Sequence, residues 1–524
     1  MEKPRIFLLF ILAINVAVFL PPGIQAKEDC SLNPPLEKKV DEISYDKRFE
    51  DVRSKIIDLV RESRVASVSV AVAEKGRIIW EEAFGWANRE ERIKSTPHTM
   101  YSIASISKPM TATGLMILVE KGLLNLDKPL NDYLGSAKLV AYEGRSSEAT
   151  VKRVLHHTSG LPLHWHFIYE NGPYLPPSMD QTIRRYGILV AAPGEIYQYS
   201  NLGYGILGHV ISRVSGKSYA QFMKSEVFLP LGMIHTSVGI GPGLEDYAAQ
   251  RYDPDQKPIP FYDFDHPGAS AVFSSAHDLV QFGMFHLKCH LPDQMQILKD
   301  ETIDLMQRDV DSKCPSIEYK LGWRVIDDDH GYRSVSHTGG MEGVCTELKI
   351  IPAENIAVVV LGNNRYRPIY NLDNEILAAM LPKFAENLKA KENKSEEKKS
   401  ERFSPPPSLL GEWEGEIKTY SGVMPVKMVF QEDGDIHLKI KDQLETLLNE
   451  VSLKEEILSG RCCGEIRTED AARFPHTIEL RMKLYDQKLS GYATANSGRW
   501  YGLSSWIMLK KTSLPKKDEK TKKR

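Results

Sequence analysis

The chain has 524 residues, of which 42% are hydrophobic and 26% charged, and its formal net charge is −3. This is the composition of an ordinary globular protein, and the length exceeds that of a typical single hydrophobic core, so we expect two domains. The nearly balanced charge gives no reason to expect nucleic acid or an anionic membrane as a partner. Function must therefore be sought in local groups of residues.

Residues 1–26 have the features of a secretory signal peptide. Lys3 and Arg5 precede the apolar run Ile6–Leu20, and the small residue Ala26 follows at a suitable distance for cleavage. The run is short for a bilayer span, which needs about 20 apolar residues. We therefore expect an exported protein, secreted or periplasmic, with a membrane anchor formed by the uncleaved segment as the alternative. The six cysteines do not define a disulfide pairing.

Residues 46–388 show an α+β pattern. Ser67–Asn88 alternates like two strands around Lys75-Gly76, and a helical pattern runs from Ser105 to Leu124. A second strand-like group follows at Gly343–Asn364, and a helical segment comes after it. Strands that occur early and late, with helices between them, predict an antiparallel sheet that joins distant parts of the chain, flanked by helices and accompanied by a helical subdomain.

The rest of the chain divides into three segments. Residues 389–407 are dense in charge, almost free of apolar residues, and close on three prolines, which predicts a linker. Residues 408–512 contain short alternating segments separated by Gly, Asp and Asn, which predict a small all-β barrel or sandwich. Residues 513–524 form a basic tail that we expect to be disordered.

One pair of residues suggests a nucleophile with its proton acceptor. Ser105 and Lys108 lie three positions apart, so on a helix they share a face. Pro109 belongs in a first helical turn, which puts Ser105 near a helix N-terminus, where developing negative charge is favoured. Burial would lower the pKa of the lysine and suit it to proton transfer. The same Ser-x-x-Lys spacing occurs at three other places, in charged segments, so spacing alone does not decide.

Two further segments contain polar groups that would complete such a site. Tyr199 and Asn201 lie in a loop just before a helical pattern; a phenol can act as a base if cations lower its pKa, and an asparagine amide can hold both a carbonyl and an amine. Tyr197 competes with Tyr199, but only Tyr199 has the spacing to the asparagine. Gly339 and Gly340 enter a strand-like segment, where backbone N–H groups can form an oxyanion hole.

Together these segments resemble the serine β-lactamase and penicillin-binding-protein superfamily. The resemblance is to the branch of class C β-lactamases, DD-peptidases, D-aminopeptidases and esterases, and it covers residues 46–388. It rests on the three segments above and on HHTSGLP, PGEIYQYSNLGYGILG, FLPLGM, GASAVFSSAHDL and SHTGGMEG, which occur in the family's order. The opening LLGEWEGEI of the C-terminal segment is similar to the lipocalin-like barrel domains of some D-aminopeptidase relatives.

The resemblance implies a role for each residue of the site. Ser105 would be acylated, Lys108 would move its proton, and Tyr199 would act as partner base and then protonate the leaving group. Asn201 would position the substrate, and the N–H groups of Ser105 and Gly340 would form the oxyanion hole. Where the family often has Lys-Thr-Gly, this chain has His337, Thr338 and Gly339, so recognition of a penicillin-like carboxylate is in doubt.

Histidines and aromatic residues outside these segments have ordinary explanations. His156-His157 and His164-Trp165-His166 lack evident acidic partners, so we expect no metal site, and the implied chemistry needs no cofactor. Trp165, Phe167, Tyr169 and Tyr174 would line a substrate cleft or belong to a proline-rich, partly packed surface loop.

Two functional hypotheses follow. The first is an exported serine hydrolase acting on a small peptide, amide or ester through an acyl-enzyme, with water or an amine as the final acceptor. The alternative is a catalytically silent scaffold or binding protein that keeps the fold. A homo-oligomer is compatible with either hypothesis.

Overall fold

The computed structural model describes residues 46–314, 318–392 and 402–513. The predicted signal peptide, much of the predicted linker and the tail beyond Ser513 lie outside these residues. Among the described helices, none combines the length and the apolar composition that a bilayer span requires. None of the described cysteines is paired.

A seven-stranded antiparallel sheet forms the centre of the first part of the chain. Strand β1 pairs with β14, with Val70 opposite Val360, so the beginning and the end of this part are joined, as the sequence predicts. The predicted hairpin around Lys75-Gly76 is also confirmed, because β1 and β2 pair side by side. In spatial order the strands are β11 (Arg324–Asp329), β12 (Tyr332–Met341), β13 (Val344–Ile351), β14 (Ile356–Gly362), β1 (Ser67–Glu74), β2 (Arg77–Asn88) and β3 (Ile93–Lys94).

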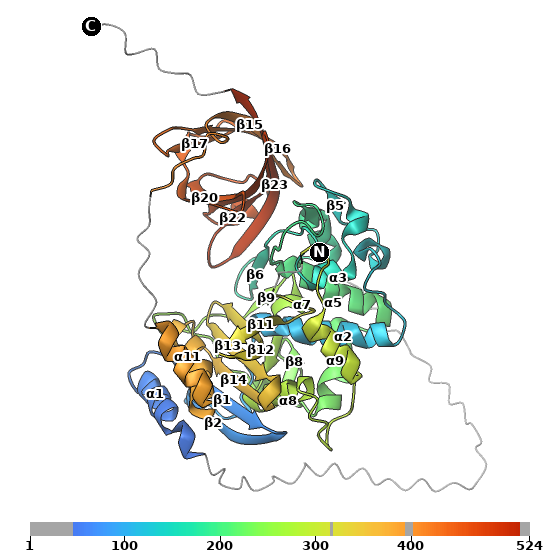
Figure 1. Ribbon diagram of the computed structural model, residues 1–524, viewed down its shortest axis with the longest axis vertical. Helices are drawn as coiled ribbons and strands as arrows, with labels where there is room; N and C mark the ends of the chain where they lie inside the picture. Colours follow the sequence, from blue (N-terminus) through green and yellow to red (C-terminus); the bar gives the residue numbers. More distant parts are fainter. Residues whose placement is uncertain (1–45, 315–317, 393–401, 514–524) are drawn as a thin grey trace, which may run out of the picture. The chain divides into compact units, whose positions relative to one another are not determined.

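Helices cover both faces of this sheet (Figure 1). On one face, alternate residues of β1 such as Val70 pack into a cluster with Ile56 of α1 (Glu50–Arg61) and Ile376 of α10 (Leu372–Met380). Helix α11 (Pro382–Glu392) adds Phe384 to the same cluster. On the other face, the intervening residues of the strands pack with α8 (Ala276–His286). A sheet buried on both faces explains why its central strands read as nearly continuous apolar runs.

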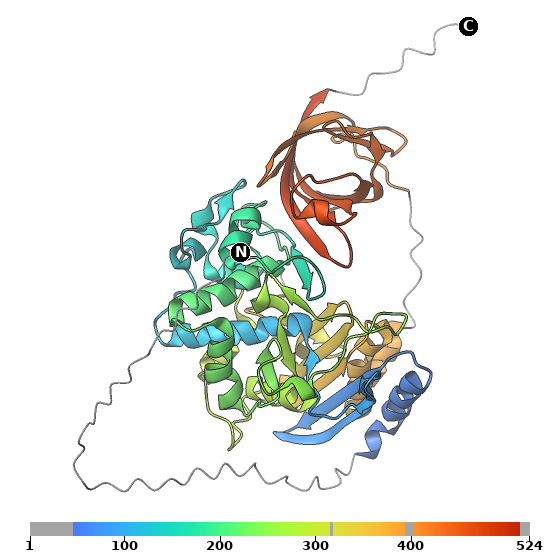
Figure 2. The ribbon, with the colours of Figure 1, turned by 180° about the vertical axis from the view of Figure 1, so that it is seen from behind.

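The helical subdomain is built around α2 (Ser107–Glu120) and α5 (Asn201–Ser215), which lie beside each other (Figure 2). Residues 107–118 of α2 are all buried, as expected for a helix that passes through a core. Gly205 of α5 allows close packing, because a Cβ there would lie 2.7 Å from Cα of His266. The remaining helices are α3 (Val151–Leu155), α4 (Met179–Tyr186), α6 (Tyr219–Met223), α7 (Pro267–Ser270) and α9 (Asp300–Arg308).

Short strands connect the helices to the sheet. They form the group β4 (Tyr101–Ser102), β10 (Val272–Ser274) and β8 (Thr236–Val238), the parallel pair β5 (Val140–Ala141) and β7 (Ile188–Leu189), and the antiparallel pair β6 (Trp165–Tyr169) and β9 (Tyr262–Phe264).

The C-terminal segment is an antiparallel, barrel-like sheet, so the predicted all-β character is confirmed. Alternate residues face its core, among them Trp413, Ile417 and Met428. Leu448 packs against Gly460, which brings the two ends of the sheet together. In spatial order the strands are β18 (Thr446–Leu447), β17 (Ile436–Ile440), β16 (Gly422–Phe430), β15 (Gly411–Thr419), β23 (Tyr501–Ser513), β22 (Lys488–Asn496), β21 (Thr477–Tyr485), β20 (Ile457–Cys463) and β19 (Asn449–Lys454). Strand β23 also pairs with β6.

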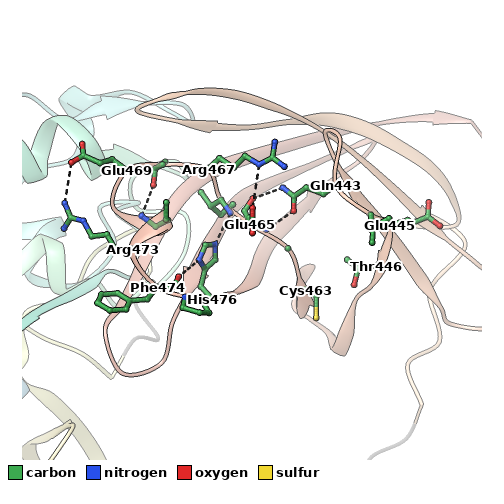
Figure 3. A pocket seen from close by; sticks show the side chains of 17 residues that line it. Gln443, Glu445, Thr446, Cys463, Glu465, Arg467, Glu469, Arg473, Phe474 and His476 are labelled. Carbon is green, nitrogen blue, oxygen red and sulfur yellow. Dashed lines mark hydrogen bonds and ion pairs between the residues drawn. The ribbon is translucent and has the colours of Figure 1, made fainter. Parts of the chain in front are cut away.

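A cavity of about 1170 Å³ belongs to this barrel-like sheet (Figure 3). Its walls come from residues 443–446 and 463–476. Its labelled side chains are mostly polar or charged, such as Glu465, Arg467 and His476 (Figure 3). None of the residues predicted for catalysis lines it.

Candidate active site

Ser105 lies in a tight turn that leads into α2. The helix begins at Ser107, and a single 3₁₀ turn (Ala104–Ile106) precedes it, so Ser105 stands just before the helix rather than on it. Ala104 has φ = 46°, a left-handed conformation that is costly for a residue with a side chain. The Ser107 hydroxyl donates to the carbonyl of Ala104 (2.7 Å) and accepts from the N–H of Val272 (3.1 Å), which fixes the turn.

Lys108 is fully buried and has three neighbours for its amine. Its Nζ donates to Oδ1 of Asn201 (2.8 Å) and to the carbonyl of Ala269 (3.1 Å), and it lies 3.0 Å from Oγ of Ser105. Burial lowers the pKa of Lys108 well below its ordinary value, as the sequence predicts. A neutral amine has two N–H groups and one lone pair. The two carbonyl oxygens use both N–H groups, so the lone pair is left for the hydroxyl of Ser105.

Tyr199 differs from its expected electrostatic state. Burial raises its pKa, although a hydrogen bond with Ser105 opposes this shift. The nearest amine, Nζ of Lys108, lies 4.7 Å from the centre of the tyrosine ring, and burial favours its neutral form. The condition for a phenol to act as a base here, a pKa lowered by cations, is therefore not met in the free protein, because the pKa of Tyr199 is raised. The phenol carries its proton at rest.

The loop that carries Tyr199 is held at the N-terminus of α5. The side chain of Ser200 caps this helix by accepting from the N–H of Gly203 (3.1 Å). Asn201 is the first helical residue, and its Nδ2 donates to the carbonyl of His164 (2.9 Å). Because its two amide atoms are both engaged, the Asn201 side chain has one orientation, with Oδ1 toward Lys108.

Strand β12 presents an open edge beside Ser105. Its outer neighbour β11 pairs only as far as Ser336, so on that side none of the described strands covers residues 337–341. A Cβ on Gly339 would overlap the carbonyl of Ile103, in the turn before Ser105, and one on Gly340 would lie 2.5 Å from Oη of Tyr370. Glycine is therefore required at position 339, and a side chain at position 340 would have to displace the hydroxyl of Tyr370. The open edge allows backbone N–H groups such as that of Gly340 to meet a substrate.

His337 contributes no positive charge to the site. Its Nδ1 donates to the carbonyl of Thr338 (2.8 Å), and its Nε2 accepts from the hydroxyl of Tyr319 (2.9 Å). Burial lowers the pKa of His337 to about 3. Both ring nitrogens are thus occupied within the protein, whereas the side chain of Thr338 is exposed. The family's lysine charge has no counterpart at position 337.

Sequence reasoning missed the aromatic surroundings of Tyr199. The ring of His157 lies 4.3 Å from that of Tyr199 and 4.5 Å from that of Tyr319. Nδ1 of His157 accepts from the N–H of Ser200 (3.1 Å), which fixes the same loop. Burial lowers the pKa of His157. The residues are far apart along the chain and share no spacing that would have identified them.

A buried carboxylate with two histidines lies next to Asn201. Nε2 of His164 donates to Asp265 (2.7 Å), and Nδ1 of His266 donates to its other oxygen (2.6 Å). Nδ1 of His166 lies 3.9 Å from the same carboxylate. The expectation that His164 and His166 lack an acidic partner is therefore wrong. The two shortest separations are those of direct hydrogen bonds, which account for the cluster without an ion between its members. The absence of a metal stays a prediction.

Two cavities meet at Ser105 and Gly340. The larger one, about 570 Å³, includes Tyr199 and His337 in its walls. The smaller one, about 270 Å³, is lined by Ser105, Trp165, Phe167, Asn201, His266, Ser270, Gly340, Met341, Glu342, Arg365 and Gly498. Ser105 therefore has open space on two sides, with the tyrosine on one side and the asparagine on the other. Of the four aromatic residues that the sequence suggested for a cleft, Trp165 and Phe167 line the smaller cavity, whereas Tyr169 and Tyr174 line neither cavity.

Comparisons with known proteins indicate the family of the chain. The model of the family described as Beta-lactamase matches residues 52–379. Penicillin-binding protein 4* of Bacillus subtilis (strain 168) is 29% identical over 311 residues, which are 53% of this chain and 64% of that protein. Protein flp of Staphylococcus aureus (strain MRSA252) is 24% identical over 318 residues, which are 58% of this chain and 60% of that protein. The chain thus spans less than two thirds of the length of these relatives.

Solved structures share the fold. The octameric penicillin-binding protein homologue from Pyrococcus abyssi has a TM-score of 0.56 and 24% identity, and the match covers 88% of this chain and 99% of that one. A class C beta-lactamase has a TM-score of 0.53 and 19% identity, with 63% of this chain and 96% of that one covered. At these identities the likeness concerns the fold, and it confirms the predicted α+β class.

Proposed function

Because the chain belongs to the Beta-lactamase family, we propose that it is a serine hydrolase that cleaves a peptide, amide or ester through an acyl-enzyme on Ser105. One observation carries the proposal. The buried amine of Lys108 has two carbonyl acceptors for its two N–H groups, and its third neighbour is Oγ of Ser105. This arrangement supports a resting base next to a hydroxyl nucleophile.

Acylation then uses each group once. Lys108 takes the proton from Ser105 as Oγ attacks the substrate carbonyl carbon. The backbone N–H groups of Ser105 and Gly340 donate to the negative oxygen that develops. Tyr199, protonated at rest, gives its proton to the leaving group, and the proton held by Lys108 restores the phenol. The raised pKa of Tyr199 supports the role of an acid, because a phenol already ionised at rest would have no proton to give.

The acyl group leaves Ser105 when water or an amine attacks the ester. We propose hydrolysis as the main outcome, with cleavage of β-lactams as incidental. The neutral state of His337 supports this view, since it removes the charge that would hold a penicillin-like carboxylate. Thr338 and Gly339 belong to the strand along which the substrate backbone would lie.

Export and assembly are further parts of the proposal. The segment 1–26, which has the composition of a secretory signal, supports a secreted or periplasmic location. A homo-oligomer is suggested by one relative of the same fold, which is described as octameric.

The test is covalent labelling by a fluorophosphonate, followed by intact mass. We expect one adduct on the wild-type protein and none on Ser105→Ala. Ser395→Ala is the matched control, because Ser395 also precedes a lysine by three positions, and it should be labelled like the wild type. An unlabelled wild type that is folded by circular dichroism would refute the proposal and favour the silent scaffold.

A further inference from the structure

The smaller of the two cavities at Ser105 has a polar wall that the proposed chemistry does not use. Tyr199 lines only the larger cavity, and in the proposed mechanism it protonates the leaving group. The leaving group therefore departs into the larger cavity, and the acyl part of the substrate occupies the smaller one. This step rests on the proposed function. The question is which acyl group the smaller cavity fits.

One wall of that cavity is His266, whose imidazole is held by Asp265. Nδ1 of His266 donates to Oδ1 of Asp265 (2.6 Å), and Oδ2 of the same carboxylate accepts from His164 (2.7 Å). The carboxylate and both rings are buried. Since Nδ1 carries the proton, Nε2 of the neutral ring is an acceptor. Nε2 is buried and has no hydrogen-bond partner among the described residues.

The charge states of the cluster agree with this tautomer. Burial lowers the pKa of His266, although Asp265 opposes the shift, so the ring is neutral near pH 7. Burial alone would raise the pKa of Asp265, but His164 and His266 together hold it below its ordinary value. The hydrogen bond from Nδ1 of the neutral His266 ring to Asp265 thus fixes which nitrogen of His266 remains open.

The packing of His266 determines which edge of its ring is available. Its Cα and Cβ face helix α5, because a Cβ at Gly205 would lie 2.7 Å from each of them. Its Nδ1 side is occupied by Asp265. His266 is among the residues that line the cavity, and Nε2 is its ring nitrogen without a partner among the described residues. An acceptor buried there without a partner is costly, and a donor in the cavity would relieve that cost.

We infer that Nε2 of His266 accepts a hydrogen bond from an N–H group on the acyl part of the substrate. The donor is an amine or an amide nitrogen close to the carbonyl under attack, as in an aminoacyl or N-acylaminoacyl group. Trp165, Phe167 and Met341 give the cavity an apolar part, and Ser270, Glu342 and Arg365 add polar and charged groups to its lining. Its volume of about 270 Å³ limits the acyl group to a small side chain. His266 is thus a specificity-determining residue, and Asp265 positions it.

The test compares three thiobenzyl esters that share one leaving group. Their acyl groups are alanyl, N-acetylalanyl and isobutyryl; the first two are used as both enantiomers, and in the third a methyl group replaces the nitrogen. Release of the thiol gives kcat/KM, normalised to the fraction of protein that a fluorophosphonate labels at Ser105. The variants are His266→Phe, which removes the acceptor but keeps a ring, and His266→Gln, which offers an oxygen acceptor at a similar reach.

We expect the wild type to prefer one nitrogen-bearing ester over the isobutyryl ester by about tenfold to a hundredfold, since a buried acceptor left unpaired discriminates at this level. The preferred ester, alanyl or N-acetylalanyl, identifies the donor as an ammonium or an amide. In His266→Phe the ratio of kcat/KM for the preferred ester to kcat/KM for the isobutyryl ester should fall to about one. In His266→Gln part of that preference should return. Partial loss of fold would lower the fraction of protein labelled by the fluorophosphonate and the cleavage of all esters alike. It would leave the ratio of kcat/KM between the esters unchanged.

Two results would overturn the inference. One is equal use of all three esters by the wild type; the other is an unchanged ratio in His266→Phe. Either result would leave the proposed hydrolase intact, because the esters would still be cleaved. If Ser105 were unlabelled and no ester were cleaved, the proposed function would fail, and this inference with it.

Discussion

The pH dependence of stability tests whether Lys108 is neutral in the folded protein. Burial lowers its pKa well below the ordinary value of 10.5, which it regains when the chain unfolds. Between these two values the unfolded chain binds one more proton than the folded protein. The free energy of unfolding therefore rises with pH in that window, by up to about 1.4 kcal/mol per pH unit. Below the lowered pKa both states are protonated, and above 10.5 both are neutral, so the slope vanishes.

Lys108→Met removes this titration and keeps an unbranched side chain. It also leaves Oδ1 of Asn201 and the carbonyl of Ala269 without their N–H donors, at a cost of about 1–3 kcal/mol each. That cost does not depend on pH. The stability of the wild type relative to Lys108→Met should therefore grow as the pH rises, by up to about 1.4 kcal/mol per unit. The free energy of unfolding of the wild type, relative to that of Lys108→Met, must increase and not decrease as the pH rises.

The measurement is urea unfolding of both proteins at about pH 7.5, 8.5 and 9.5. Ser105→Ala is the control, because it removes the nucleophile but keeps the lysine, and its curve should run parallel to that of the wild type. If the wild type and Lys108→Met ran parallel instead, Lys108 would be protonated throughout the range. It would then have no lone pair for Ser105, and the argument for a resting base would be refuted.

Three further outcomes are expected. Tyr199→Phe should lower kcat on a Ser105-dependent ester by about a hundredfold or more, whereas Tyr197→Phe, in the same loop, should change it by less than about threefold; equal effects would contradict the role of Tyr199 as acid. Gly340→Ala places a Cβ 2.5 Å from the hydroxyl of Tyr370 and should shift the backbone N–H proposed for the oxyanion hole, so we expect kcat to fall by about a hundredfold. KM, measured on the same ester, should change much less; a change confined to KM would contradict this role. Asp373→Asn removes the negative charge nearest to buried Lys349 (2.6 Å) and leaves Asp329 (3.4 Å) as its other carboxylate partner. It should lower the free energy of unfolding by about 3 kcal/mol, measured in urea; a loss below about 1 kcal/mol would show that Asp329 compensates for the lost charge.

The sequence predicted those parts of the molecule whose signal is local. The strands around Lys75-Gly76 and Gly343–Asn364 are visible because buried strands read as apolar runs. Ser105, Lys108 and Pro109 are visible because their spacing has a meaning at a helix start. The structure moves the start of the helix to Ser107, since the strained turn at Ala104 precedes it.

Residues that are brought together by tertiary structure left no such signal. Asp265 and His266 lie in a segment with no catalytic motif, and only the packing of β6 and β9 brings them to His164. The direction of the pKa shift of Tyr199 was also out of reach, because it depends on how deeply the ring is buried and on whether its neighbour is charged. Burial is set by the whole fold, so a local pattern cannot give it.

The three polar groups around Ser105 share one principle. In each, the hydrogen bonds within the protein decide how many positions stay open: Lys108 keeps a lone pair, and His266 keeps Nε2. His337 keeps none, because both of its nitrogens are bonded internally. Since a buried group with one open position has one way to act, the fold selects its chemistry without changing the residue. The number of open hydrogen-bonding positions thus separates the two histidines: His337 has none and only holds its surroundings in place, whereas His266 has one with which to select a substrate.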